Sequence, residues 1–146
     1  MYITLMNKTT ILQDNNQIII LTTLNSSIKK RILLVDDEPD ITLTFKIALE
    51  STRLFEVYTF NEPLQALANF KSGFYHLILT DIKMPKMSGY EFSQKIKEID
   101  NYIKICFLTA SEIYHGDCEQ KGANYFIKKP LAIDELVKQI NSILVA

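Results

Sequence analysis

Short apolar runs alternate with amphipathic stretches from Arg31 to the end of the chain. Apolar residues recur at helical spacing between the runs, behind helix-start signals such as Asp37 with Pro39, and Ser88. Gly73 is a predicted helix stop. The runs are rich in branched and aromatic residues, which predicts buried strands, and they span 32–35, 55–60, 76–80, 103–108 and 125–127.

Strands that are apolar throughout, with helices between them, indicate a parallel sheet covered on both faces. The final helix has the clearest apolar stripe, formed by Ile133, Leu136, Val137, Ile140, Ile143 and Leu144. Because crossover connections between parallel strands are right-handed, few topologies remain. We predict an open, doubly wound α/β domain over residues 30–146.

Residues 1–29 do not show this alternation of apolar runs and amphipathic stretches. The segment from Gln17 to Leu24 could form a strand, but its flanks are rich in Asn, Thr and Ser. We favour a loosely ordered N-terminal extension, or a start codon placed too far upstream. The alternative is an extra strand or helix that docks on the domain or on a second copy.

Composition narrows the function classes. Hydrophobic residues make up 47% and charged residues 23%, which is ordinary for a soluble globular protein. A net charge of -1 gives no basic excess, so we expect no direct binding to nucleic acid. The N-terminal apolar run 18–21 is too short to span a membrane, and no signal peptide is recognisable. We therefore expect a cytoplasmic protein without a membrane partner.

The two cysteines lack metal-ligand spacing. Cys106 lies in an apolar run and is predicted to be a core residue, whereas Cys118 lies in a polar stretch. A reduced, intracellular protein is the simpler interpretation, although a disulfide stays open.

Polar side chains follow the predicted strands at the points where they end. Asp36 and Asp37 follow the first strand, Asp81 the third, Thr109 the fourth, and Lys129 comes shortly after the fifth. In open α/β sheets, ligands bind beyond the carboxyl ends of the strands. We therefore expect three carboxylates, a hydroxyl and an ammonium group to converge there.

Such a convergence favours a bound cation. Two carboxylates about 4 Å apart repel by roughly 4 kcal/mol at an effective dielectric constant of about 20. Three of them need a raised pKa or a metal, and oxygen ligands without histidine or cysteine suit Mg²⁺. A carboxylate beside a phosphate-binding metal can act as a nucleophile and form an aspartyl phosphate. The sequence thus predicts magnesium-assisted phosphoryl transfer.

Four segments resemble the signature segments of response-regulator receiver domains. They are residues 32–39, 79–89, 108–110 and 129–130, in order and each at a strand end. The resemblance covers nearly everything from Arg31 onward. It implies a flavodoxin-like, five-stranded parallel sheet with strand order 2-1-3-4-5 and helices on both faces.

The resemblance also implies a set of metal ligands. Asp36 and Asp37 would hold Mg²⁺, Asp37 directly and Asp36 largely through water. Asp81 would supply a further oxygen, and the backbone carbonyl of Lys83 another.

The same resemblance implies the parts that receive the phosphoryl group. Asp81 would accept it from a sensor histidine kinase or a phosphotransfer protein. Lys129 would pair with Asp81 at rest and with the phosphoryl group after transfer. Thr109 would bond a phosphoryl oxygen, and the aromatic Phe126 would turn inward behind it. Such a switch would act on a downstream protein target, with a homodimer as an open alternative.

One segment departs from the family pattern. The stretch between Thr109 and Lys129 is shorter than we expect, and Gly116 falls in the middle of its helix. Interior glycine costs about 1 kcal/mol relative to alanine, so this helix is predicted to be short or mobile. Receivers usually dimerise or contact targets through this face, so its partner interface is predicted to be altered.

Two other functions compete with a single-domain signalling switch. A phosphatase of the haloacid-dehalogenase type also uses an aspartyl phosphate and Mg²⁺. It places its nucleophile in an Asp-x-Asp pattern after the first strand, and the adjacent pair Asp36-Asp37 lacks that spacing. The other alternative is a scaffold that has lost phosphorylation, against which the intact set of acidic residues, hydroxyl and lysine argues. We expect no enzyme activity beyond the chain's own phosphoryl transfer and autodephosphorylation.

Overall fold

A computed structural model describes residues 3–6, 9–14, 17–22, 28–110, 125–129 and 131–146. The predictions about the helix around Gly116 and about Cys118 fall outside the described residues. Cys106 is buried as predicted, and burial raises the pKa of its thiol to about 12.

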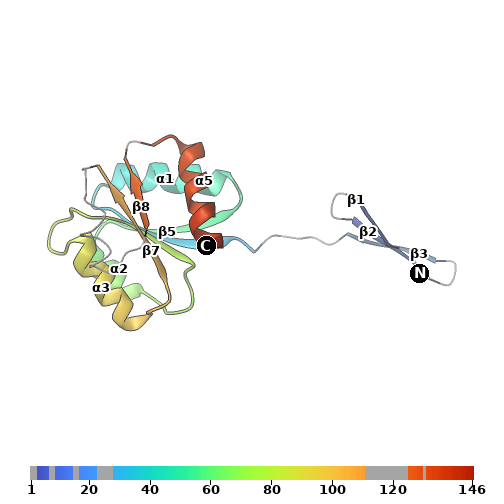
Figure 1. Ribbon diagram of the computed structural model, residues 1–146, viewed down its shortest axis with the longest axis horizontal. Helices are drawn as coiled ribbons and strands as arrows, with labels where there is room; N and C mark the ends of the chain where they lie inside the picture. Colours follow the sequence, from blue (N-terminus) through green and yellow to red (C-terminus); the bar gives the residue numbers. More distant parts are fainter. Residues whose placement is uncertain (1–2, 7–8, 15–16, 23–27, 111–124, 130) are drawn as a thin grey trace.

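Three short strands form an antiparallel sheet near the N-terminus (Figure 1). They are β1 (Ile3–Met6), β2 (Thr9–Asp14) and β3 (Gln17–Thr22), in the order β1-β2-β3. The strand considered at Gln17–Leu24 corresponds to β3, whereas β1 and β2 were not predicted. The division of the chain at residue 30 stays a prediction.

Five parallel strands form the second sheet. They are β4 (Lys30–Val35), β5 (Phe55–Phe60), β6 (Leu77–Asp81), β7 (Lys104–Thr109) and β8 (Tyr125–Lys128). Their order is β5-β4-β6-β7-β8, and all four pairings are parallel. This is the order 2-1-3-4-5, so the predicted doubly wound α/β fold is confirmed.

Helices cover both faces of this sheet (Figure 1). On one face lie α1 (Pro39–Ser51) and α5 (Ile133–Val145), and on the other α2 (Pro63–Asn69) and α3 (Gly89–Ile99). Successive residues of a strand point to opposite faces. Ile32 and Leu34 of β4 accordingly join the core under α1 and α5, while Leu33 and Val35 join the core under α2 and α3.

The helix ends follow the sequence signals in part. Ser88 caps α3 as predicted, because its side chain accepts from the Glu91 N–H while the Glu91 carboxylate accepts from the Ser88 N–H. Gly73 does not stop α2, which ends at Asn69; it lies in the following loop with φ +76°. No helix among the described residues is both long and apolar enough to cross a membrane.

The outer edge of β5 is covered by side chains from α1. Glu50 Oε1 accepts from the N–H of Val57 at 3.0 Å, and Lys46 Nζ donates to the carbonyl of the same residue. Lys46 and Glu50 also form an ion pair with each other at 2.9 Å. Both backbone groups of Val57 on the open side of the strand are therefore satisfied.

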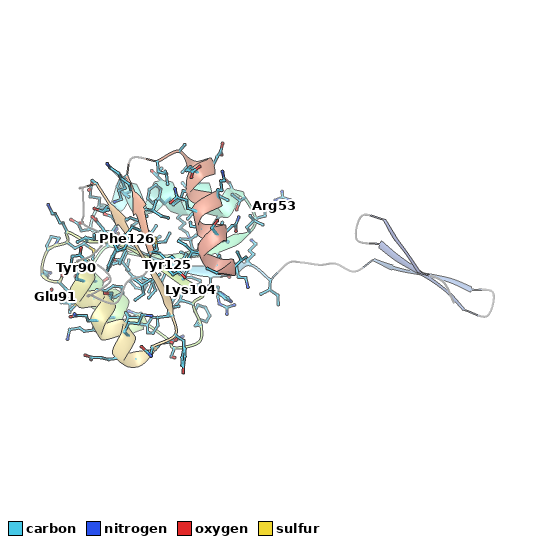
Figure 2. The ribbon with its side chains drawn as sticks, viewed as in Figure 1. Arg53, Tyr90, Glu91, Lys104, Tyr125 and Phe126 are labelled. Carbon is cyan, nitrogen blue, oxygen red and sulfur yellow. The ribbon has the colours of Figure 1, made fainter. Side chains whose placement is uncertain are left out.

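At the opposite end of the sheet from its carboxyl edge, two side chains tie loops and helix ends together. The Asp100 carboxylate accepts four hydrogen bonds, from the Ser72 hydroxyl and from the N–H groups of Gly73, Tyr102 and Ile103. Lys104 Nζ donates to the last carbonyls of the chain in and after α5 (Figure 2). These hydrogen bonds join the loops at the amino ends of β6 and β7 to the ends of α3 and α5.

Candidate functional site

Three carboxylates meet at the carboxyl edge of the five-stranded sheet. Asp36 and Asp37 directly follow β4, and Asp81 is the last residue of the neighbouring β6. One oxygen from each carboxylate can be chosen so that all three lie within 4.8 Å of one another. The predicted convergence of these acidic groups is therefore present.

Asp36 is the most deeply buried of the three, with no solvent exposure. Its Oδ1 accepts from the N–H of Glu38 at 3.0 Å, and its Oδ2 accepts from Lys129 Nζ at 2.7 Å. The sequence analysis expected Lys129 to pair with Asp81 at rest, but its ion pair lies with Asp36. The physical reason is burial, because a carboxylate without solvent needs a partner charge more than one that retains some.

Asp81 is only partly buried, yet the pKa of its carboxyl is raised above its ordinary value. Partial burial is the largest cause, and the neighbouring charges of Asp36 and Asp37 raise the pKa further. The charge of Lys129 and a hydrogen bond from the Ile82 N–H to Oδ1, at 2.7 Å, oppose this rise. The ionised form is thus short of positive charge, which a divalent cation would supply.

The oxygen-only ligand set fits Mg²⁺. This ion prefers hard oxygen ligands and binds through one or two carboxylates plus phosphate oxygens. The cluster has no cysteine or histidine among its members. Asp37 and Asp81, which are partly exposed, can reach a cation open to solvent, while the pairing of Asp36 with Lys129 suits contact through water.

Thr109 lies on β7, the strand beside Asp81, and Phe126 lies on β8, the next strand beyond it. Thr109 ends β7 and is buried, and its carbonyl accepts from the N–H of Lys129 at 2.7 Å. Phe126 of β8 is partly buried, with its ring 5.7 Å from that of Phe107. Phe107 in turn meets Tyr90 of α3 edge to face at 4.9 Å, so Phe126 and Tyr90 flank one aromatic ring (Figure 2). Because the N–H of Lys129 donates to the Thr109 carbonyl, Lys129 is held beside the end of β7.

The loop after Asp81 returns tightly to the sheet. The N–H of Gly89 donates to the Ile82 carbonyl at 2.8 Å, and a Cβ atom at Gly89 would lie 2.0 Å from the Asp81 carbonyl oxygen. Only glycine fits this contact. Lys83 in the same loop is exposed, and the role of its backbone carbonyl as a metal ligand stays a prediction.

Sequence reasoning missed the part played by Asn61. Its side-chain amide donates to the Asp36 carbonyl and to the Thr42 hydroxyl, directly behind the acidic pair. The sequence analysis did not place Asn61 at the site. A polar residue directly after β5, at the same sheet edge as the carboxylates, was the available signal.

The chain is similar in sequence to known response regulators. The model of the response regulator receiver domain matches residues 32–141. The response regulator receiver protein CpdR of Brucella abortus is 33% identical over 119 residues, covering 80% of this chain and 98% of CpdR. The transcriptional regulatory protein TrcR of Mycobacterium tuberculosis is 31% identical over 78% of this chain, but the chain spans only 45% of TrcR.

Solved structures give the same result. The response regulator TrrA from Thermotoga maritima, in complex with Mg²⁺-BeF, superposes with a TM-score of 0.70 at 36% identity, covering 78% of this chain and 98% of TrrA. A CheY-like receiver domain protein from Methanospirillum hungatei gives a TM-score of 0.73 at 30% identity, covering 80% and 94% of the two chains. With its fold, its acidic cluster and its matched range in agreement, this chain belongs to the response regulator receiver domains of two-component signalling.

Proposed function

We propose that this chain is a phosphorylation-activated switch that accepts a phosphoryl group on Asp81 with the help of Mg²⁺. The observation that carries the proposal is the meeting of Asp36, Asp37 and Asp81 at one sheet edge, with Lys129 bonded to the buried member. TrrA, a relative in structure, was solved in complex with Mg²⁺-BeF, which supports a magnesium site in this fold.

The chemistry is an in-line transfer to a carboxylate. The hydrogen bond from Ile82 falls on Asp81 Oδ1, so we assign Oδ2 as the attacking atom. The new Oδ2–P bond forms as the P–N bond of a phosphohistidine breaks, and the departing imidazole nitrogen keeps the electron pair and takes a proton from water. Mg²⁺, when bound, neutralises charge on the phosphoryl oxygens and on the carboxylates.

The chain's own groups then hold the product. Lys129, whose ammonium lies beside the carboxylates, is placed to donate to a phosphoryl oxygen. Thr109 lies at the next strand end and would donate its hydroxyl to another oxygen. Phe126 would pack further inward behind Thr109, which would carry the change of state to the surface around β8.

The partners of the switch follow from the same chemistry. The donor would be a sensor histidine kinase or a phosphotransfer protein, and the output would be a contact with a downstream protein or a second copy. CpdR, a response regulator receiver protein of which the chain covers 98%, supports a switch that is formed by the receiver domain itself. We place the protein in the cytoplasm, where such donors present their phosphohistidines.

Incubation of the full chain with acetyl phosphate and Mg²⁺, followed by intact-mass measurement, tests this proposal. We expect addition of one phosphoryl group, its loss in Asp81→Asn, and no addition when a chelator is present from the start. Asp134→Asn, which alters an exposed carboxylate in the first turn of α5, is the matched control and should be labelled normally. Catalytic release of phosphate without a labelled protein would indicate a phosphatase, and no labelling at all would indicate a scaffold.

A further inference from the structure

We propose that Asn61 is a positioning residue whose side-chain amide fixes the peptide between Asp36 and Asp37 and thereby sets the affinity of the site for Mg²⁺. The inference rests on the proposed function, because it concerns the same carboxylates. Asn61 is not one of the three carboxylates that form the cluster, and its role is to hold the backbone that carries two of them.

Asn61 holds the main chain of Asp36 from the end of the neighbouring strand. Asn61 is the first residue after β5, and its Nδ2 donates to the Asp36 carbonyl at 2.9 Å. The N–H of Asp36 donates to the carbonyl of Phe60 at 3.2 Å. Both main-chain polar groups of Asp36 are thus bonded to two consecutive residues at the end of β5.

A second bond from the same amide extends this hold to α1. Asn61 Nδ2 also donates to Thr42 Oγ1 at 3.0 Å, and Thr42 Oγ1 donates to the Pro39 carbonyl at 3.0 Å. Thr42 is only 3% exposed, so water cannot readily replace these bonds. The chain of bonds from Asn61 through Thr42 to Pro39 fixes the first turn of α1.

Asp37 lies between the two fixed points. The Asp36 carbonyl is bonded on one side of Asp37, and the Pro39 carbonyl on the other. The carboxylate of Asp36 has its own partners in Lys129 and the Glu38 N–H. The orientation of Asp37, by contrast, depends on the backbone that carries it, so we expect loss of the Asn61 bonds to act mainly through Asp37.

Partners that orient metal ligands commonly change metal affinity by about 10–100-fold when they are removed. For Asn61→Ala in the full chain, we expect the dissociation constant for Mg²⁺ to rise about tenfold, as measured by titration calorimetry. Thr42→Val removes the second acceptor while preserving shape, and should weaken Mg²⁺ binding in the same direction. Asn69→Ala removes an asparagine amide bond far from the carboxylates in sequence, from Asn69 Nδ2 to the Gln65 carbonyl at 2.8 Å within α2, and should leave the affinity unchanged.

A metal-free measurement separates positioning from general loss of stability. The N–H of Glu38 bonds to Asp36 Oδ1 inside the held turn, whereas Ile78 lies in the centre of β6. We expect hydrogen exchange at the Glu38 amide to accelerate in Asn61→Ala more than exchange at Ile78. A purely structural role would accelerate both equally and leave Mg²⁺ affinity intact.

The outcomes distinguish this inference from the function on which it rests. Mg²⁺ binding by the wild type together with unchanged binding by Asn61→Ala would overturn the inference alone. If Asn61→Ala fails to fold, Thr42→Val decides by the same two measurements. A wild-type chain that does not bind Mg²⁺ would overturn the proposed function and the inference with it.

Discussion

Replacement of Gly89 by alanine is the sharpest test of how the site is built. The added Cβ would lie 2.0 Å from the carbonyl oxygen of Asp81 and 3.0 Å from its carbonyl carbon, both of them backbone atoms. No side-chain rotation can relieve a contact with backbone. The loop after β6, or the end of β6 itself, must therefore move by about 1 Å, an overpacking that typically costs about 1–3 kcal/mol.

The displacement falls on the residue that we assign as the phosphoryl acceptor. A misplacement of about 1 Å can reduce a reaction rate by about 100-fold. We therefore expect Gly89→Ala to label from acetyl phosphate about 100-fold more slowly than the wild type. Initial rates are read by intact mass, and thermal unfolding of the same samples gives the stability cost.

A second glycine supplies the control. Gly73 has φ +76°, but a Cβ there would meet nothing within 4 Å. Gly73→Ala should therefore lose about 1 kcal/mol of stability through backbone strain while labelling at the wild-type rate. Wild-type labelling and stability in Gly89→Ala would refute the reasoning, because the loop would then be free to accept a methyl group.

Three further predictions concern charge. Lys129→Met leaves the buried carboxylate of Asp36 without its ion-pair partner, so the free energy of unfolding in urea should fall by about 3 kcal/mol and partly recover with Mg²⁺; an unchanged midpoint would contradict this. Partial burial and like charges raise the folded-state pKa of Asp81, so its ionisation costs stability as pH rises through that pKa. Without metal, Asp81→Asn should have a higher melting temperature than the wild type at pH 7, but not at a pH below 3.8, the ordinary pKa of an aspartate carboxyl. Equal melting temperatures of the two proteins at both pH values would exclude the effect. Partial burial raises the pKa of Asp100, but the hydrogen bonds that its carboxylate accepts outweigh this effect, so the pKa is lowered in the folded state. The carboxylate therefore stabilises the fold above its unfolded pKa, and this stabilisation is lost as pH falls through the folded pKa. Asp100→Ala should cost about 1–3 kcal/mol of stability at pH 7 and less in acid, and a cost that does not change with pH would contradict this prediction.

The fold could be predicted because continuous apolar runs and helically spaced apolar residues alternate along the chain. Continuous apolar runs fix buried parallel strands, and the helical stripe of α5 fixes one covering layer. Strand ends then fix the site, since Asp36 and Asp81 must meet once β4 and β6 are neighbours. The resemblance to receivers supplied the order of the strands.

The partner of Lys129 could not be predicted in the same way. Its choice of Asp36 depends on how deeply each carboxylate is buried, and depth is decided by packing of the whole edge. The bonds of Asn61 were missed for a related reason. They join residues 19 and 25 positions apart, and no local pattern reports such contacts.

The covered outer edge of β5 limits strand pairing between copies of the domain. A neighbouring strand that aligned beside Val57 would find both backbone groups already engaged, and would have to displace Glu50 and Lys46 before it gained a single bond. Growth of the sheet from this side is therefore discouraged in the native state. Edge-to-edge aggregation of the domain through β5 is therefore opposed by Lys46 and Glu50, two side chains that lie one helical turn apart on α1.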